Sequence, residues 1–296
     1  MTTEFDIAVS ELGTEASAGL DELLTKRFGG RPIVEYAYGE PTEWAELADG
    51  GWDLLAASEE DGGAGLPLRD LIAVAMTVGR WLPPLPLLET AMVKRWSEPA
   101  RDGGPASVAI AIESGRVMIP FGATADITVL TAGGAVAAPG AVTADDYAPS
   151  LRLTEAGSGS ASPLTPEQAR ELAIIWAAEA AGCADRMLDI AIAYVKQREQ
   201  FGQPVGRFQA VKHHLADALK FAHESESAVL WAAADAPKIA PALEVAFDSA
   251  LRAAEIGVQA HGGMGFTWEL GLHVYLRQIV SLRQLALAAA AIADAA

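Results

Sequence analysis

The sequence predicts a mainly α-helical protein in which a small β domain separates two helical parts. Three observations support this fold class. Along residues 166–296, apolar residues recur every three, four or seven positions, the spacing of one helix face. Residues 105–153 instead carry short β-branched runs separated by Gly and Pro, which is typical of strands. The chain has 296 residues, 51% of them hydrophobic, enough for a large buried core.

An N-terminal helical domain is expected over residues 1–95. Loose helical spacing covers residues 1–28, and firmer spacing predicts a helix over 68–81. A glycine-rich turn at 58–65 lies between them. Prolines that follow the second helix end the pattern, because proline donates no backbone hydrogen bond. The apolar face of the second helix consists of Leu71, Ile72, Ala75 and Val78.

A reduced β domain with its linker is expected over residues 96–165. The linker is assigned to residues 155–162, which are rich in Gly and Ser. Short strands are expected at 107–112, 117–119, 127–131 and 135–137.

A C-terminal four-helix bundle is expected over residues 166–296, because long helical patterns with short connections favour that arrangement. The first helix is expected to end at Tyr194 and the second to start near Phe208. The third covers 241–259, and the fourth begins near Trp268. Core positions are predicted for Trp176, Cys183 and Trp231.

The acidic composition makes some classes of binding partner unlikely. Lys and Arg total 21 against 39 Asp and Glu, a formal net charge of −18. Such a surface repels phosphate backbones and anionic lipid heads, so neither nucleic acid nor a membrane is an expected partner. The five histidines show no metal-binding spacing with Asp or Glu, so no metal site is expected.

The sequence also predicts a soluble cytoplasmic protein. Its one cysteine, Cys183, cannot form an intrachain disulfide, which fits a reducing compartment. The first ten residues lack the basic and apolar series of a signal peptide. No apolar run reaches the roughly 18 residues that a membrane helix needs, and the closest is Leu285–Ala293.

The segment from Arg198 to Gln209 is the first with recognisable chemistry. It reads Arg-Glu-Gln-Phe-Gly-Gln-Pro-Val-Gly-Arg-Phe-Gln and connects two predicted helices. The Arg198 guanidinium is suited to phosphate, and Phe201 offers a flat face to a heterocycle. The alternative is an ordinary interhelix loop with a solvated arginine and a core phenylalanine.

The second such segment runs from Gln259 to Phe266 and contains Gly262, Gly263 and Gly265. These glycines permit close backbone approach to a ligand, with N–H groups free to meet phosphate oxygens. The segment is not a dinucleotide fingerprint, because it lies between helices rather than after a strand. A helix C-cap followed by a turn explains it equally well.

Together the two segments resemble the C-terminal domain of acyl-CoA dehydrogenases. That family carries an Arg-x-x-Phe-Gly run, a following Phe-Gln or His-Gln pair, and a later Gln-x-x-Gly-Gly-x-Gly-Phe/Tyr run, and all occur here in order. The turn at 59–65 looks like the family's Pro-Glu-Glu-Tyr-Gly-Gly-Ala-Gly turn. The resemblance implies the family fold, an oxidoreductase of lipid metabolism, and FAD shared between two subunits.

The resemblance also assigns cofactor contacts. Arg198, Phe201 and Gln209 match residues that contact the FAD of a neighbouring subunit. Gln259, Gly262 and Gly263 match the run that receives its pyrophosphate or adenine half. No Gly-Ser-Asp run of the family's longer β domain is found, so the chain resembles a half-site for a neighbour's cofactor.

The family's catalytic base is missing at both of its usual positions. The base is a Glu followed by Gly-Thr, and ungapped alignment places Ala286 there. Other members carry the Glu on the helix before the Arg-x-x-Phe-Gly loop, which falls on Leu172 with Glu171 beside it. A one-residue shift turns a helical side chain by roughly 100°, so Glu171 is a poor substitute.

The expected function is therefore that of a flavoprotein subunit in an acyl-CoA dehydrogenase. It would supply FAD contacts to a catalytic partner subunit. Relatives with divided labour form α2β2 heterotetramers, and several act on CoA-linked steroid side chains, which suggests steroid catabolism. An acyl-CoA substrate and an acceptor like electron-transfer flavoprotein are implied. The alternatives are a self-sufficient homomeric enzyme with Glu171 as base and a flavin-free structural homologue.

Overall fold

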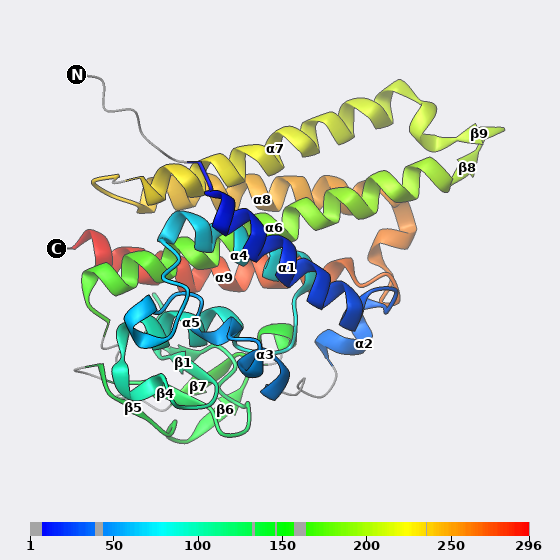
Figure 1. Cartoon of the computed structure of the whole chain (residues 1–296). Helices are drawn as coiled ribbons and strands as arrows, with labels where there is room; N and C mark the ends of the chain where they lie inside the picture. The colour runs from blue at the N-terminus through cyan, green and yellow to red at the C-terminus, as the bar shows by residue number, and fades with distance from the viewer. Residues whose placement is uncertain are drawn as a thin grey trace.

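The computed structural model describes residues 8–38, 44–131, 134–145, 147–156, 164–234 and 236–295. It confirms a mainly α-helical fold with small sheets. Figure 1 shows four long helices stacked above the sheets, with shorter N-terminal helices against them. The bundle helices are α6 (Pro166–Gln197), α7 (Gln209–Ala233), α8 (Ala240–Ala260) and α9 (Leu272–Asp294).

Helix α6 is the central element of the bundle. It begins at a capping box, in which the Thr165 hydroxyl accepts from the Gln168 N–H and the Gln168 side chain accepts from the Thr165 N–H. Pro166 occupies the first turn, where its missing N–H has no consequence. The helix packs against α7, α8 and α9 and also against the N-terminal α4, so it joins the two helical parts.

The N-terminal part contains α4 (Leu68–Trp81), as the apolar spacing predicts. Two glycines let α4 and α6 approach closely. A Cβ on Gly79 would lie 1.9 Å from the Glu179 carbonyl oxygen, and one on Gly182 would lie 2.0 Å from that of Met76. Only glycine fits at either position. The other helices are α1 (Glu11–Phe28), α2 (Ile33–Ala37), α3 (Ala45–Asp49) and α5 (Leu87–Trp96).

A buried ion pair holds α5 to the short turn that follows α3. The Lys94 ammonium lies 2.6 Å from Asp53 Oδ2, and both residues are buried. The same ammonium donates to the carbonyl oxygens of Arg101 and Gly103, at 3.1 and 2.9 Å. These acceptors satisfy the three donors of a lysine that has left water.

The β part forms two small sheets. One has the order β1–β4–β5, with β1 (Ala106–Val108) parallel to β4 (Thr128–Leu130). The other has the order β2–β3–β7–β6 and is antiparallel. The remaining strands are β2 (Ile110–Ala111), β3 (Val117–Ile119), β5 (Val136–Ala137), β6 (Val142–Ala144) and β7 (Thr154–Ala156).

Several sequence-based expectations are wrong in detail. The predicted linker begins inside β7, because Glu155 and Ala156 pair with β3 and β6; its remaining residues lie outside the described part. The fourth bundle helix begins at Leu272, since Gly271 in left-handed backbone (φ 71°) precedes it. Trp231 is 53% exposed, because it lies on the outer side of α7.

The expectation about membrane helices is also corrected. By length and composition, α9 could span a membrane. A helix in the core of a soluble protein passes the same test, and α9 packs against α6 and α8. Trp176 and Cys183 are buried in the same core, as predicted. The proposed boundaries at residues 95 and 165 stay predictions.

Candidate functional site: an exposed half-site at one end of the bundle

The predicted loop from Arg198 to Gln209 contains a two-stranded hairpin. Its strands are β8 (Glu199–Gln200) and β9 (Gln203–Pro204). Figure 1 shows the hairpin projecting beyond the ends of α6 and α7. Phe201 at its tip is 93% exposed and adopts a positive φ of 54°. An aromatic ring held this far outside a core is available to another molecule.

Arg198 lies at the root of the hairpin. Its backbone N–H caps α6 by donating to the Tyr194 carbonyl at 2.9 Å, and its carbonyl accepts from Val205 at 2.8 Å. The side chain is exposed, and no ion pair with a described residue holds it. Lys196, Arg207 and Lys212 are exposed beside it in sequence. A local group of cations thus interrupts an otherwise acidic surface, as an anionic ligand requires.

The glycine segment forms a short 3-10 turn, η7 (Gly262–Phe266), after α8. Gly262 has a φ of 60°, which only glycine adopts readily. Nothing lies within 4 Å of a Cβ built on Gly262 or Gly263, so the side-chain direction at both positions is open. Phe266, at the end of the turn, is 82% exposed. Bare amides beside an exposed ring suit a ligand that is both anionic and aromatic.

The fold brings the two segments to the same end of the bundle. The Tyr194 ring stacks on His261 with centroids 4.4 Å apart, and its hydroxyl lies 3.8 Å from Met264 Sδ. Gln209 begins α7, directly after Phe208, whose ring meets Phe201 edge-on at 6.1 Å. The predicted cofactor residues are all exposed, namely Arg198, Phe201, Gln209, Gln259, Gly262 and Gly263. Sequence reasoning missed Tyr194 and His261, although His261 lies inside the glycine run.

Neither position matched to the family's base carries a carboxylate, since they hold Leu172 and Ala286. Leu172 is fully buried. Glu171 Oε1 lies 3.2 Å from Arg95, and its Oε2 accepts from Trp96 Nε1 at 2.6 Å. Ala286 lies in the interior of α9 and is also fully buried. Glu171 therefore ties the bundle to α5.

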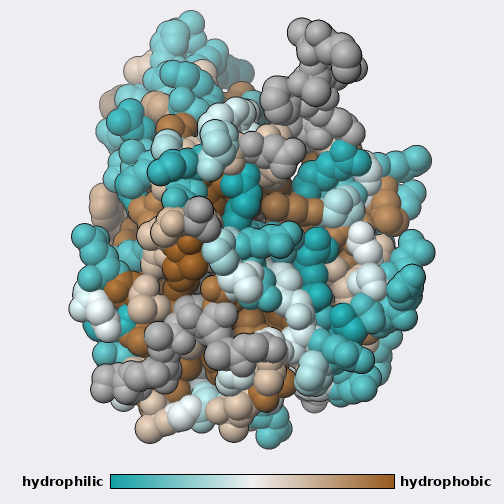
Figure 2. Space-filling view, turned by 90° about the vertical axis from the view of Figure 1, so that its left-hand side faces the viewer, coloured by the Kyte–Doolittle hydropathy of each residue, from teal (hydrophilic) through white to brown (hydrophobic). Residues whose placement is uncertain are grey.

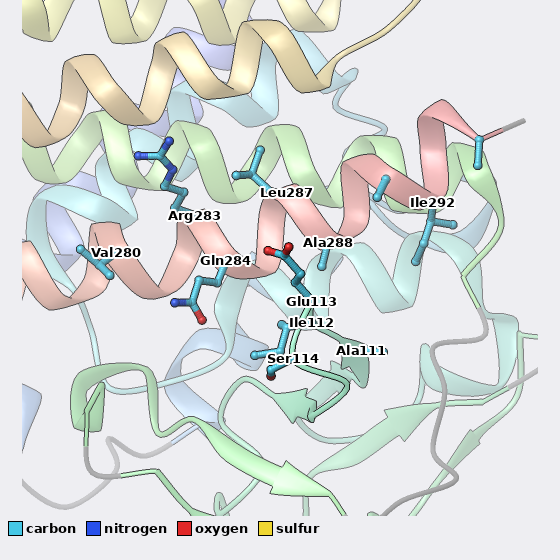
Figure 3. A pocket seen from close by; sticks show the side chains of 12 residues that line it. Ala111, Ile112, Glu113, Ser114, Val280, Arg283, Gln284, Leu287, Ala288 and Ile292 are labelled. Atoms are coloured by element: carbon cyan, nitrogen blue, oxygen red, sulfur yellow. The ribbon is translucent and has the colours of Figure 1, made fainter.

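A large cleft lies elsewhere, between α9 and the turn that joins β2 to β3. It measures about 1110 Å³. Figure 3 shows Glu113 of that turn reaching toward α9, while Arg283 points away from the turn. In Figure 2 the side of the molecule that carries the C-terminus faces the viewer, and apolar residues (brown) are exposed there among polar ones (teal). None of the predicted cofactor residues lines this cleft.

Two carboxyl groups are buried where α5, α6 and α9 meet. Glu89 accepts from Trp176 Nε1 at 2.9 Å, and Glu179 accepts from Gln278 Nε2 at 2.7 Å. Burial raises the pKa of both groups. The pKa of Glu179 rises to about 8, with repulsion from Glu89 as the second cause. The Glu179 side chain is therefore protonated and neutral at pH 7.

Glu179→Gln is expected to make the protein more stable at neutral and mildly alkaline pH. An unfolded glutamate releases its proton near pH 4.5, whereas folded Glu179 keeps it to about pH 8. Between these values the stability of the wild type falls as pH rises, because only the folded state still holds the proton. Glutamine removes that slope and can still accept from Gln278, so the gain at pH 8 is on the order of 2–4 kcal/mol. Urea unfolding at pH 5 and pH 8 measures it.

Glu60→Gln, at an exposed position, is the matched control and should keep the pH dependence of the wild type. An equal slope in wild type and Glu179→Gln would show that Glu179 is ionised in the folded protein.

Comparisons with known proteins place the chain among characterised relatives. The family model described as acyl-CoA dehydrogenase, C-terminal domain, matches residues 169–286. Acyl-CoA dehydrogenase IpdE2 of Mycobacterium tuberculosis is 34% identical over 249 residues, which are 78% of this chain and 77% of the relative. IpdE2 of Mycolicibacterium smegmatis is 31% identical over 291 residues, 93% of each chain.

Two solved structures are similar in fold. The crystal structure of the ChsE4-ChsE5 complex from Mycobacterium tuberculosis matches with a TM-score of 0.74 and 22% identity, covering 97% of this chain and 96% of that chain. A Tcur3481-Tcur3483 steroid ACAD variant matches with a TM-score of 0.67 and 22% identity, covering 92% of each. Because both are only 22% identical to this chain, these two structures support a similarity of fold and nothing further.

Proposed function

The chain belongs to the acyl-CoA dehydrogenase family, and on that premise we propose that it is the flavin-contacting subunit of a complex whose catalytic base lies in a partner subunit. The reaction is the α,β-desaturation of an acyl-CoA thioester. A base would take the α-proton, and bound FAD would supply the acceptor for the β-hydrogen. A weakly acidic thioester α-proton requires a carboxylate in a dry pocket.

One observation carries the proposal: the cofactor residues are exposed and lie together at one end of the bundle. Arg198 and the glycine amides are unshielded, and Phe201 has almost its whole surface in solvent. Such a surface contributes one side of a site that a second chain completes. The two base positions hold buried Leu172 and Ala286, which favours a division of labour between subunits.

The residues of the half-site fit FAD by their chemistry. When bound, FAD supplies the hydride acceptor. The Arg198 guanidinium would bind pyrophosphate oxygens through charge-assisted hydrogen bonds. The amides at Gly262 and Gly263 would meet the same anion, because both residues are exposed and lack a side chain. Phe201 would cover a flat heterocycle and exclude water from it.

The partner in this proposal is a second acyl-CoA dehydrogenase chain, and the assembly is a heterotetramer of two copies of each. The similar ChsE4-ChsE5 structure is itself a complex of two different chains. A steroid-linked acyl-CoA is the proposed substrate, because the other similar structure is described as a steroid ACAD. An acceptor like electron-transfer flavoprotein would reoxidise the FAD.

Co-expression tests the proposal. The chain alone is expected to purify without flavin absorption. Expressed with an acyl-CoA dehydrogenase chain that acts as its partner, it should give a yellow complex whose light-scattering mass corresponds to four chains. A yellow, active homo-oligomer would favour the self-sufficient enzyme. A colourless complex that stays inactive after FAD is added would favour the flavin-free structural homologue.

Glu171→Gln is expected to leave turnover of the complex within about threefold, less than roughly 1 kcal/mol in the barrier. The reason is that both carboxylate oxygens of Glu171 are already engaged, one by Arg95 and the other by Trp96. Loss of a general base costs about a hundredfold or more. Steady-state turnover, corrected for flavin content, measures the effect.

Gel filtration of the same variant controls for assembly. A collapse of turnover with intact assembly and FAD content would make Glu171 the base and this chain the catalytic one.

A further inference from the structure

His261 lies between the two segments of the half-site and is only 3% exposed. It also determines where α8 ends. Its backbone N–H donates to the Val258 carbonyl at 3.1 Å, three residues back. The Gly257 carbonyl, four residues before His261, therefore accepts from the His261 side chain, and its oxygen lies 2.7 Å from Nδ1. The chain then turns at Gly262 in left-handed backbone.

The other side of the imidazole meets Tyr194. The two rings lie 4.4 Å apart with 32° between their planes. Tyr194 belongs to the last turn of α6, and its carbonyl accepts the Arg198 N–H at 2.9 Å. Its hydroxyl reaches Met264 Sδ inside η7, 70 residues away in sequence. The root of the hairpin and the glycine turn therefore touch through these two rings.

A histidine is energetically unfavourable at this buried position. Its Nε2 is buried and has no hydrogen-bond partner among the described residues. An unpaired buried polar atom costs about 1–3 kcal/mol, a penalty that leucine or phenylalanine would avoid. Burial lowers the pKa of His261 below its usual 6.5, which favours the neutral ring. The Gly257 carbonyl oxygen can only accept, so Nδ1 carries the proton of that hydrogen bond. Histidine provides both a flat ring that contacts Tyr194 and an Nδ1 hydrogen bond to the Gly257 carbonyl.

We propose that His261 is a positioning residue of the cofactor half-site. With Tyr194 it forms an aromatic clasp, defined as the stacked Tyr194 and His261 rings. The clasp fixes the separation between the Arg198 guanidinium and the amides of Gly262 and Gly263. A dinucleotide can then meet both segments without first ordering them, which strengthens its binding. This inference rests on the proposed function, since it assumes that the half-site receives FAD.

The test uses the co-expressed complex and measures FAD affinity by titration after flavin removal. His261→Leu and Tyr194→Leu are each expected to weaken binding about fivefold to tenfold, the effect of losing one aromatic pair. The double variant should be no weaker than either single variant, because both remove the same contact. Tyr194→Phe keeps the ring and should bind FAD normally. Trp231→Leu, on the outer side of α7, is the matched control.

Arg198→Ala separates this inference from the proposed function. If Arg198→Ala leaves FAD affinity unchanged, the proposed function fails. If it weakens binding while His261→Leu and Tyr194→Leu do not, only the clasp is wrong. Additive losses in the double variant would also overturn the clasp, since each residue would then act alone. Should His261→Leu unfold in thermal melting, the comparison of Tyr194→Leu with Tyr194→Phe decides.

Discussion

Arg198→Ala is expected to weaken FAD binding to the complex by about 1.5–3 kcal/mol, the range for a hydrogen bond to a charged group. The guanidinium is exposed at the hairpin root, so its removal should not disturb the fold. Arg198→Lys is expected to recover part of the loss, because the ammonium keeps the charge but lacks the planar fork. Flavin retention through gel filtration and an FAD titration measure the effect.

Arg207→Ala is the matched control, because it removes the same charge from the same loop at a position without a predicted contact. Its loss should be below about 1 kcal/mol, as expected of an exposed charge. Equal losses from the two variants would mean that the loop attracts FAD by its total charge. A fully yellow Arg198→Ala complex with unchanged FAD affinity would make Arg198 an ordinary loop residue and would contradict the proposed flavin-contacting function.

Lys94→Met is expected to lower the free energy of unfolding by about 3–5 kcal/mol, the usual cost of removing one partner of a buried ion pair. Methionine replaces the volume of the lysine stem. The carboxylate of Asp53 is then left in the interior without its cation, and the carbonyls of Arg101 and Gly103 lose their donor. Guanidinium unfolding at neutral pH measures the change.

Two further variants locate the cause of that loss. The double variant Lys94→Met with Asp53→Asn should recover more than half of it, because no uncompensated charge remains. Arg116→Met, which breaks exposed ion pairs to Asp145 and Glu155, should change stability by less than about 1 kcal/mol. Equal effects from Lys94→Met and Arg116→Met would show that burial does not strengthen the Lys94–Asp53 contact.

The fold could be predicted from the sequence where local signals agree. Helix α4 has the expected bounds, since its apolar face is continuous and prolines follow it. The strands were harder, because none of β1–β7 exceeds three residues. Strands this short are stabilised by partners distant in sequence, such as the parallel pairing of β1 with β4. Thus β7 was concealed inside a stretch whose composition favours a linker.

The candidate site could be predicted as segments but not as an arrangement. The glycines and Arg198 are visible in the sequence, because each has a chemistry of its own. The ring contact of Tyr194 with His261 is not visible, since it depends on how α6 and α8 end relative to each other. The exposure of Phe201 was also hidden, because an aromatic residue near a glycine is as typical of a core as of a surface.

The unbroken course of α9 has an evolutionary consequence. Placing a glutamate at Ala286 would put a carboxylate at a fully buried position between packed helices, where it would be protonated or would disrupt the core. A helix would first have to be broken by inserted residues before a base there could meet a substrate. On the proposed function, a single substitution at this position would therefore not give the chain a base of its own, and the chain would still need the base of the partner subunit.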